Sequence, residues 1–173
     1  NRRQRHLTIP CEMCIRDRSH TTAPVNVGTS VIGLRYKDGV MLACDTSVSY
    51  GSMRHSKHQT RVHKLSDESA MVTSGEMSDF QEFVKILREK YESDVIENDG
   101  AQFLKPRDYF NYISRINYQR RMKGDPLWTG NIIGGVRQDN GEIFLGMVDL
   151  YGTKIEGNFL LTGLAAHYCQ VLL

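Results

Sequence analysis

Residues 28–45 read GTSVIGLRYKDGVMLACD, and this stretch is the strongest indication of the fold. Its first half alternates side chains between two faces. Its second half, residues 40–44, is a continuous apolar run of the kind found in strands buried on both faces. Asp38-Gly39 separates the two halves, and Asp-Gly between apolar runs is a strong hairpin signal. The stretch therefore predicts two antiparallel strands joined by a tight turn and followed by the carboxylate of Asp45.

Two long amphipathic helices are predicted in the middle of the chain. The first begins at Ser78, where Ser78 and Gln81 form a capping box, and it carries an apolar stripe at helical spacing. The second begins at Pro106, where proline is best tolerated, and it ends before Gly124. Both stripes are typical of helices that bury one face against a core rather than of ligand sites.

Short strands surround these helices in the sequence. They are predicted at residues 61–65, 70–73, 132–136, 143–150 and 154–161, with a loop over residues 47–60 and a helix from residue 163. Strands and helices do not alternate, so the sequence does not predict a parallel sheet. It predicts an α+β fold in which two antiparallel sheets pack face to face, with helices outside.

The composition is ordinary for a soluble globular domain. A chain of 173 residues, 40% hydrophobic and 24% charged, is long enough to bury a substantial core. The net charge of +2 predicts no nucleic-acid and no membrane partner. No apolar run approaches the about 18 residues of a membrane span. The four cysteines show no disulfide pattern, which favours a reducing compartment, the cytoplasm and nucleus.

Residues 1–20 share no pattern with the rest of the chain. They are rich in arginine and predict a leader or propeptide. The alternative is a segment that is not native protein, because residues 14–19 resemble a translated sequencing adaptor. Cys11 and Cys14 form a CxxC pair, with His6 as a third potential ligand. Zinc needs four ligands, so this pair favours no metal site.

The domain itself is predicted to span residues 21–173. The chain stops on the apolar residues 171–173, inside a predicted helix and without a capping signal. This ending predicts that the domain is incomplete at its C-terminus.

Three histidines in the first half of the domain raise the question of a metal site. His55, His58 and His63 are spaced by three and five residues on a predicted loop and strand, with no carboxylate among them. This pattern favours a solvated surface. We therefore expect no metal and no cofactor.

The opening of the domain resembles that of proteasome β subunits. The resemblance is carried by Gly28-Thr29, by the apolar strand that ends at Asp45, and by Ser49-Tyr50-Gly51-Ser52. In that family the Thr at this place is an N-terminal nucleophile whose base is its own free α-amine. The resemblance implies the αββα sandwich of N-terminal-nucleophile hydrolases.

The resemblance also assigns the positions of the family's active site. Thr29 takes the position of the nucleophile, Asp45 that of the supporting acid, and Gly75 that of the backbone oxyanion hole. Arg61 takes the position of the family's lysine. Arginine stays protonated and has a larger planar head, so it does not substitute for lysine there. Leu164 falls at the position of a supporting serine and cannot form a hydrogen bond through its side chain. The resemblance therefore implies a degenerate site.

Further motifs resemble one non-catalytic member of the family. They are Ser74-Gly75 followed by Asp79-Phe80-Gln81, residues 118–123 followed by Pro126-Leu127-Trp128, and a mature N-terminus at Thr21-Thr22-Ala23-Pro24. This likeness implies processing between His20 and Thr21, which leaves eight residues ahead of Thr29. The nitrogen of Thr29 is then an amide and cannot act as a base.

The resemblance thus implies a non-catalytic structural β subunit of the proteasome core particle. Its implied role is to support ring assembly, while neighbouring subunits carry out ATP- and ubiquitin-dependent protein degradation. The implied partners are other α and β subunits and assembly chaperones, in a hetero-oligomer without a cofactor. Thr29 and Asp45 are expected to persist for packing, with Asp45 paired to Arg61.

Two alternatives belong to other functional classes. The first is an active threonine endopeptidase with Thr29 as nucleophile, which requires cleavage between Gly28 and Thr29 and tolerance of Arg61. The second is a free-standing binding module built on the same hairpins.

Overall fold

The structure is a computed structural model, and it describes residues 24–99 and 104–171. Eight of the strands in these residues are β1 (Asn26–Gly28), β4 (Val48–Tyr50), β5 (Met53–Ser56), β6 (Val62–Lys64), β7 (Ser69–Glu76), β8 (Thr129–Val136), β9 (Ile143–Val148) and β10 (Lys154–Glu156). They form one antiparallel sheet in the order β10-β9-β8-β7-β1-β4-β5, and β6 also pairs with β7.

A smaller sheet lies against one face of the large one. It consists of β2 (Val31–Tyr36), β3 (Gly39–Cys44) and β11 (Phe159–Thr162), in the order β11-β2-β3. The predicted hairpin is present, because β2 pairs with β3 from Val31 opposite Cys44 to Tyr36 opposite Gly39. Strand β11 pairs antiparallel with β2 on the other side.

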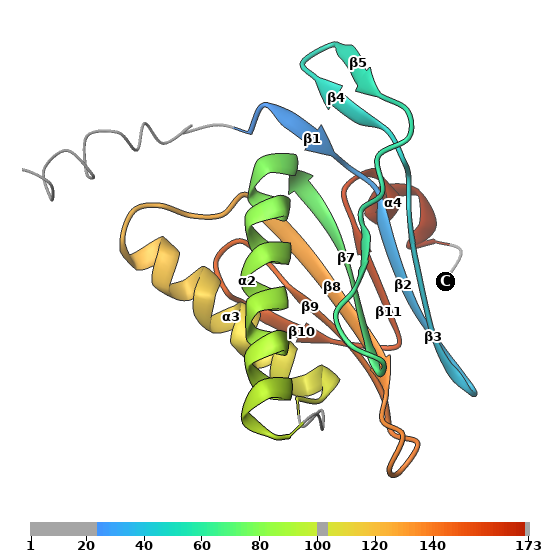
Figure 1. Cartoon of the computed structure of the whole chain (residues 1–173). Coiled ribbons are helices and arrows are strands. Elements are labelled where there is room, and N and C mark those ends of the chain that lie inside the picture. Colours follow the sequence, from blue (N-terminus) through green and yellow to red (C-terminus); the bar gives the residue numbers. More distant parts are fainter. Residues whose placement is uncertain (1–23, 100–103, 172–173) are drawn as a thin grey trace, which may run out of the picture.

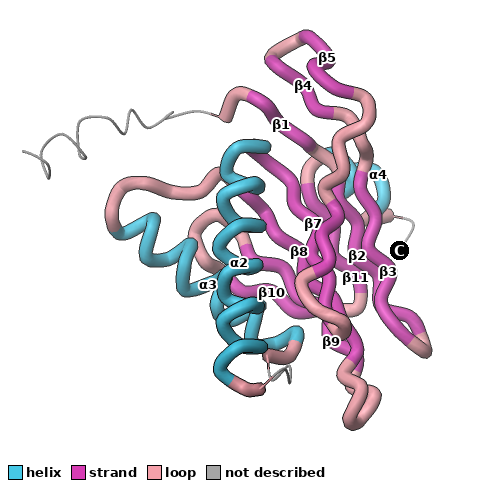
Figure 2. The backbone as a smooth tube through the Cα atoms, in the orientation of Figure 1, coloured by secondary structure: helices cyan, strands magenta, loops and turns pink. Residues whose placement is uncertain are grey.

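Two long helices cover the other face of the large sheet. They are α2 (Met77–Glu97) and α3 (Pro106–Met122), and a short helix, α4 (Leu164–Cys169), follows β11. Figure 1 shows α2 and α3 on one side of the large sheet and β2 and β3 on the other. The tube in Figure 2 shows the same separation of α2 and α3 from the small sheet. The predicted α+β class, with two antiparallel sheets packed face to face and helices outside, is confirmed.

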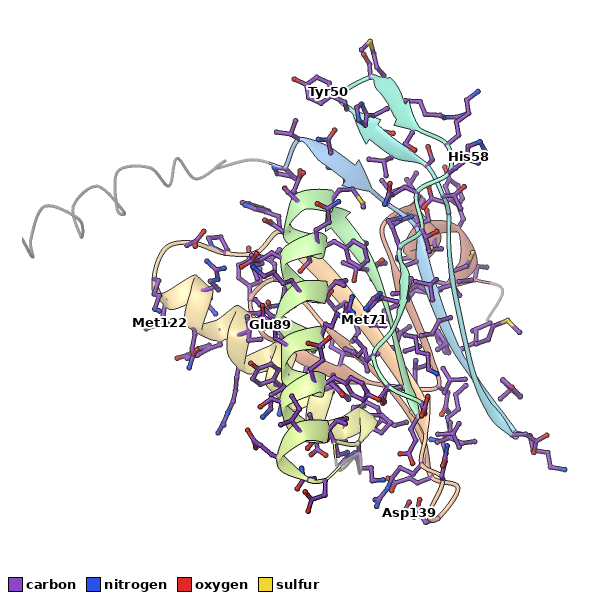
Figure 3. The ribbon with its side chains drawn as sticks, viewed as in Figure 1. Tyr50, His58, Met71, Glu89, Met122 and Asp139 are labelled. Atoms are coloured by element: carbon purple, nitrogen blue, oxygen red, sulfur yellow. The ribbon has the colours of Figure 1, made fainter. Side chains whose placement is uncertain are left out.

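The central strands serve two cores at once, because successive side chains of a strand point to opposite faces. Met71 and Ile133 pack with the helices, whereas their neighbours Val72 and Ile132 pack with the small sheet. All four are fully buried. Figure 3 shows the side chain of Met71 inside the molecule, close to α2.

One predicted strand is less buried than expected. The apolar run at residues 40–44 predicts burial on both faces, but only Val40, Leu42 and Cys44 pack against the large sheet. Met41 is 58% exposed, and Ala43 is exposed as well. The described residues place a packing layer on only one face of β3, so the prediction of two buried faces is wrong.

The predicted loop over residues 47–60 is also wrong in part. It contains the antiparallel hairpin of β4 and β5, which projects beyond the rest of the molecule in Figure 1. Its strands are short and polar, so they carry no alternating pattern that reveals a strand. Figure 3 shows Tyr50 near the tip of this hairpin.

The predicted helix start is shifted as well. The helix α2 begins at Met77, with Glu76 at the N-cap, and Ser78 lies in the first turn. The hydroxyl of Ser78 donates a hydrogen bond to the carboxylate of Glu76 at 3.1 Å. The predicted capping box between Ser78 and Gln81 is therefore wrong. In the described parts of the chain, no helix is long and apolar enough to cross a membrane.

Tyr109, on α3, offers a direct test of this core. Its side chain is 1% exposed, and its hydroxyl has no hydrogen-bond partner in the described structure. A buried polar group without a partner costs about 1–3 kcal/mol. We therefore expect Tyr109→Phe to leave the free energy of unfolding at pH 7 unchanged or to raise it by about 1 kcal/mol. Urea unfolding of the full-length protein measures this change.

At alkaline pH the free energies of unfolding of the wild type and of Tyr109→Phe should differ further. Burial, followed by the charge of Asp94, raises the pKa of Tyr109 well above its usual value of 10.0. The unfolded chain therefore loses this proton first, and the stability of the wild type falls as pH rises above 10, by at most about 1.4 kcal/mol per pH unit from this group. The Tyr109→Phe variant lacks this loss. An equal loss of stability in both proteins between pH 9 and pH 11 would contradict the prediction.

Candidate functional site

Thr29 lies at the junction between the two sheets. Gly28 ends β1 in the large sheet and Val31 begins β2 in the small one. Thr29 and Ser30 therefore carry the chain from one sheet to the other. Thr29 is partly exposed, and its nitrogen is the peptide nitrogen that joins it to Gly28. In this chain the hydroxyl of Thr29 has no free α-amine beside it.

The strand β1 lies between β4 and β7 in the large sheet and pairs with both. On one side Asn26 pairs with Tyr50 and Val27 with Ser49, and on the other side Val27 pairs with Glu76. Gly28 pairs with Gly75. At these positions β4 and β7 are paired with β1, so no other extended segment can pair with them there.

Arg61 connects the segments around Thr29. Its guanidinium is buried, with 1% of the side chain exposed, and it forms an ion pair with the carboxylate of Asp45, which is 37% exposed. Its Nη1 donates to the carbonyl of Thr73 at 3.0 Å. Its Nη2 donates to the carbonyls of Asp45 at 2.7 Å and of Ser30 at 3.3 Å. The carboxylate of Asp45 also accepts the N–H of Ser30 at 3.2 Å.

The same guanidinium limits the space next to Thr29. A Cβ atom added to Gly28 would lie 2.6 Å from the Cδ and Nε atoms of Arg61. Real Cβ atoms do not approach other atoms so closely, and Arg61 is held on several sides, so residue 28 has to be glycine. The cation at the lysine position therefore binds backbone carbonyls and the carboxylate of Asp45, and it fills the space beside Gly28.

Gly75 is fixed by its backbone. It adopts a φ of +109°, and a Cβ atom on it would lie 2.1 Å from the carbonyl oxygen of Trp128. The same oxygen accepts the N–H of Glu76 at 2.9 Å. Both the conformation and the close approach to the loop before β8 require glycine here.

Leu164 begins α4, close to the backbone of Thr29. A Cβ atom on the preceding residue, Gly163, would lie 2.3 Å from the carbonyl oxygen of Thr29. The side chain of Leu164 is 58% exposed and carries only hydrocarbon. The structure thus brings Arg61, Asp45 and Gly28 together, with Gly75 paired to Gly28, and it supplies no hydroxyl at residue 164.

Glu76 is a residue of this region that sequence reasoning missed. Its side chain is buried, with the residue 5% exposed, and its Oε2 accepts the backbone N–H of Asn26 at 2.9 Å and that of Val25. A glutamate directly before a predicted helix resembles an ordinary first-turn acid. Its partners lie about fifty positions earlier in the sequence, so no local pattern indicates them.

Other predicted positions fall outside this region. The processing residues His20 and Thr21, and the cysteine pair near the start of the chain, lie outside the described residues. In residues 24–99 and 104–171, no three His, Cys, Asp or Glu side chains are grouped so that they could hold a metal ion. Partial burial, followed by the charge of Arg88, lowers the pKa of His63 below its usual 6.5.

Known proteins similar to this chain come from one family. The family described as "Proteasome subunit" matches residues 25–173. The chain is 38% identical to the proteasome subunit beta type-4 of Arabidopsis thaliana, over 91% of this chain and 63% of that protein. It is 36% identical to the proteasome subunit beta type-7 of Saccharomyces cerevisiae, over 89% of this chain and 59% of that protein. It is 34% identical to the proteasome subunit beta type-4 of Xenopus laevis, over 89% of this chain and 62% of that protein. The chain thus spans about three fifths of the length of these relatives.

Proposed function

The chain belongs to the proteasome subunit family, and on that premise we propose that it is a non-catalytic β subunit of the proteasome core particle, corresponding to the relatives named beta type-4. Its role is structural: it completes a ring whose neighbouring subunits hydrolyse the peptide bonds. Membership of the family over nearly the whole chain excludes the alternative of an unrelated, free-standing binding module.

The observation that carries this proposal is the place of β1. A threonine nucleophile of this class needs its own free α-amine as base. Here the nitrogen of Thr29 is bonded to Gly28, and Gly28 belongs to a strand paired to β4 and β7. An amide nitrogen cannot accept the hydroxyl proton, so the hydroxyl is not activated. The same strand also takes the positions at which an extended peptide could otherwise pair with β4 and β7.

The basic residue beside Thr29 supports the same conclusion. A catalytic site of this kind needs a compact ammonium group whose position leaves the amine accessible. Arg61 instead directs Nη1 and Nη2 to backbone carbonyls and to Asp45. A guanidinium stays protonated and cannot shift its charge to suit a neighbouring amine. Leu164, at the position of the supporting serine, adds no hydrogen-bonding group.

The partners and the location follow as parts of the same proposal. The chain assembles with other α and β subunits in a hetero-oligomer, with the help of assembly chaperones, in the cytoplasm and nucleus. It contributes to ATP- and ubiquitin-dependent degradation through its neighbours. The leader ends between His20 and Thr21, and no cofactor takes part.

An intact-mass measurement on purified particles tests the proposal. We expect the mass of a chain that begins at Thr21, upstream of Thr29. A threonine-directed covalent inhibitor should leave this mass unchanged. Catalytic subunits in the same sample gain the mass of the inhibitor and serve as the internal control. In the same particles, Thr29→Ala should leave all peptide-hydrolysing activities unchanged. A mass that begins at Thr29 and rises by one inhibitor would establish the alternative, an active threonine endopeptidase.

A further inference from the structure

We propose that the carboxylate of Glu76 holds β1 in its place between β4 and β7 by accepting backbone N–H groups where the strand begins. We call this contact the latch. The inference rests on the proposed function, because only a chain that keeps residues 25–28 needs to hold them. Glu76 is then a positioning residue: it acts on the site through β1 and does not touch any reacting atom.

The side chains of β1 do little to anchor it. The side-chain oxygen of Asn26 is buried without a hydrogen-bond partner in the described structure. Val27 is only partly buried, and Gly28 has no side chain. A strand of three residues gains little from backbone pairing alone, since it makes few hydrogen bonds for the entropy it loses. Its position therefore depends on an additional contact.

Glu76 supplies that contact at the place where β1 begins. The Oε2 atom accepts the N–H group of Asn26, the first residue of the strand, and that of Val25, the residue directly before it. Hydrogen bonds from backbone N–H groups to an ionised carboxylate are roughly twice as strong as neutral ones. The contact thus fixes the end of β1 that lies farthest from Thr29.

Glu76 itself is held in place for this task. Its backbone N–H donates to the carbonyl of Trp128 at 2.9 Å, and its Oε1 accepts the hydroxyl of Ser78 at 3.1 Å. It occupies the N-cap of the 21-residue helix α2, whose positive dipole end favours an anion. The side chain makes no capping hydrogen bond to its own helix. Its Oε2 atom accepts the N–H groups of Val25 and Asn26 instead.

Hydrogen exchange on intact particles tests the latch. In Glu76→Ala we expect the amides of residues 25–28 to exchange about 10- to 100-fold faster, as the loss of one or two charge-assisted hydrogen bonds implies. Glu76→Gln keeps an oxygen acceptor without the charge, so its exchange should lie between that of the wild type and that of the alanine variant. The amides of β8, in the centre of the sheet, should not change.

Glu82→Gln is the matched control, because Glu82 lies on the same helix but its contact is elsewhere. Its carboxylate is 48% exposed and lies 3.7 Å from the guanidinium of Arg120. This variant should leave exchange at residues 25–28 unchanged. Unchanged exchange in Glu76→Ala would overturn the latch, and so would a uniform increase that includes β8, which indicates general destabilisation. Failure of the proposed function is distinguishable, because the intact mass of the subunit would then begin at Thr29 and residues 25–28 would be absent.

Discussion

Replacing Arg61 by alanine is expected to lower the free energy of unfolding of the full-length subunit by about 3–5 kcal/mol, because the change removes a large buried side chain and leaves its hydrogen-bond acceptors unpaired. The side chain of Arg61 is 1% exposed. Its removal leaves the carbonyls of Thr73 and Asp45 without this donor and opens a cavity beside Gly28. Urea unfolding and the amount of subunit in assembled particles both measure the loss.

Two comparison variants identify the source of this loss. Lys64→Ala removes a cation from an exposed pair with Asp67, both about 70% exposed, and should change the stability far less, because water and salt screen an exposed pair. Asp45→Ala should cost less than Arg61→Ala, because Asp45 is partly exposed and Arg61 keeps its carbonyl acceptors. If Arg61→Ala costs no more than Lys64→Ala, then Arg61 does not connect the segments around Thr29.

Replacing Gly75 by alanine is expected to cost about 3 kcal/mol or more, because conformational strain and a steric overlap add together. Its φ of +109° is strained for any residue with a Cβ atom. The new Cβ would also lie 2.1 Å from the carbonyl oxygen of Trp128, which has to move and then weakens the hydrogen bond from Glu76. The change therefore disturbs β7, the start of α2 and the pairing of Gly28 at once.

Gly51→Ala is the matched control for this prediction. Gly51 has a φ of +57°, and a Cβ atom on it meets nothing within 4 Å, so it carries the conformational cost alone, about 1 kcal/mol. The difference between the two losses of stability measures the energetic cost of the steric overlap between a Cβ atom at residue 75 and the carbonyl oxygen of Trp128. Equal losses in the two variants would show that this approach does not constrain residue 75, and Gly75 would then have another reason to be glycine.

Much of the fold could be predicted from local patterns. The hairpin of β2 and β3 follows from the Asp38-Gly39 turn between two apolar runs, and both long helices follow from stripes at helical spacing. Pro106 correctly marks the start of α3. These signals depend on residues a few positions apart, so a single sequence contains all the information they need.

The candidate site could be predicted only as a set of positions. Resemblance to the family selected Thr29, Asp45, Arg61, Gly75 and Leu164, and the roles that it assigns to them stay predictions. The pairing of Arg61 with Asp45 was a hypothesis drawn from the resemblance, and the structure places the two side chains in contact. The additional carbonyl acceptors of Arg61 were not predictable. Every residue has a backbone carbonyl, so the residue types do not indicate which of them Arg61 contacts.

The sequence by itself thus determined the class of fold, the two long helices and the central hairpin. Only the tertiary structure decided that β1 lies between β4 and β7, and that Glu76 binds the N–H groups of Val25 and Asn26 where this strand begins. The physical reason is the range of the interactions. Strands of three residues are too short to show a period, and their partners lie some twenty to fifty positions away, so only the folded chain brings them together.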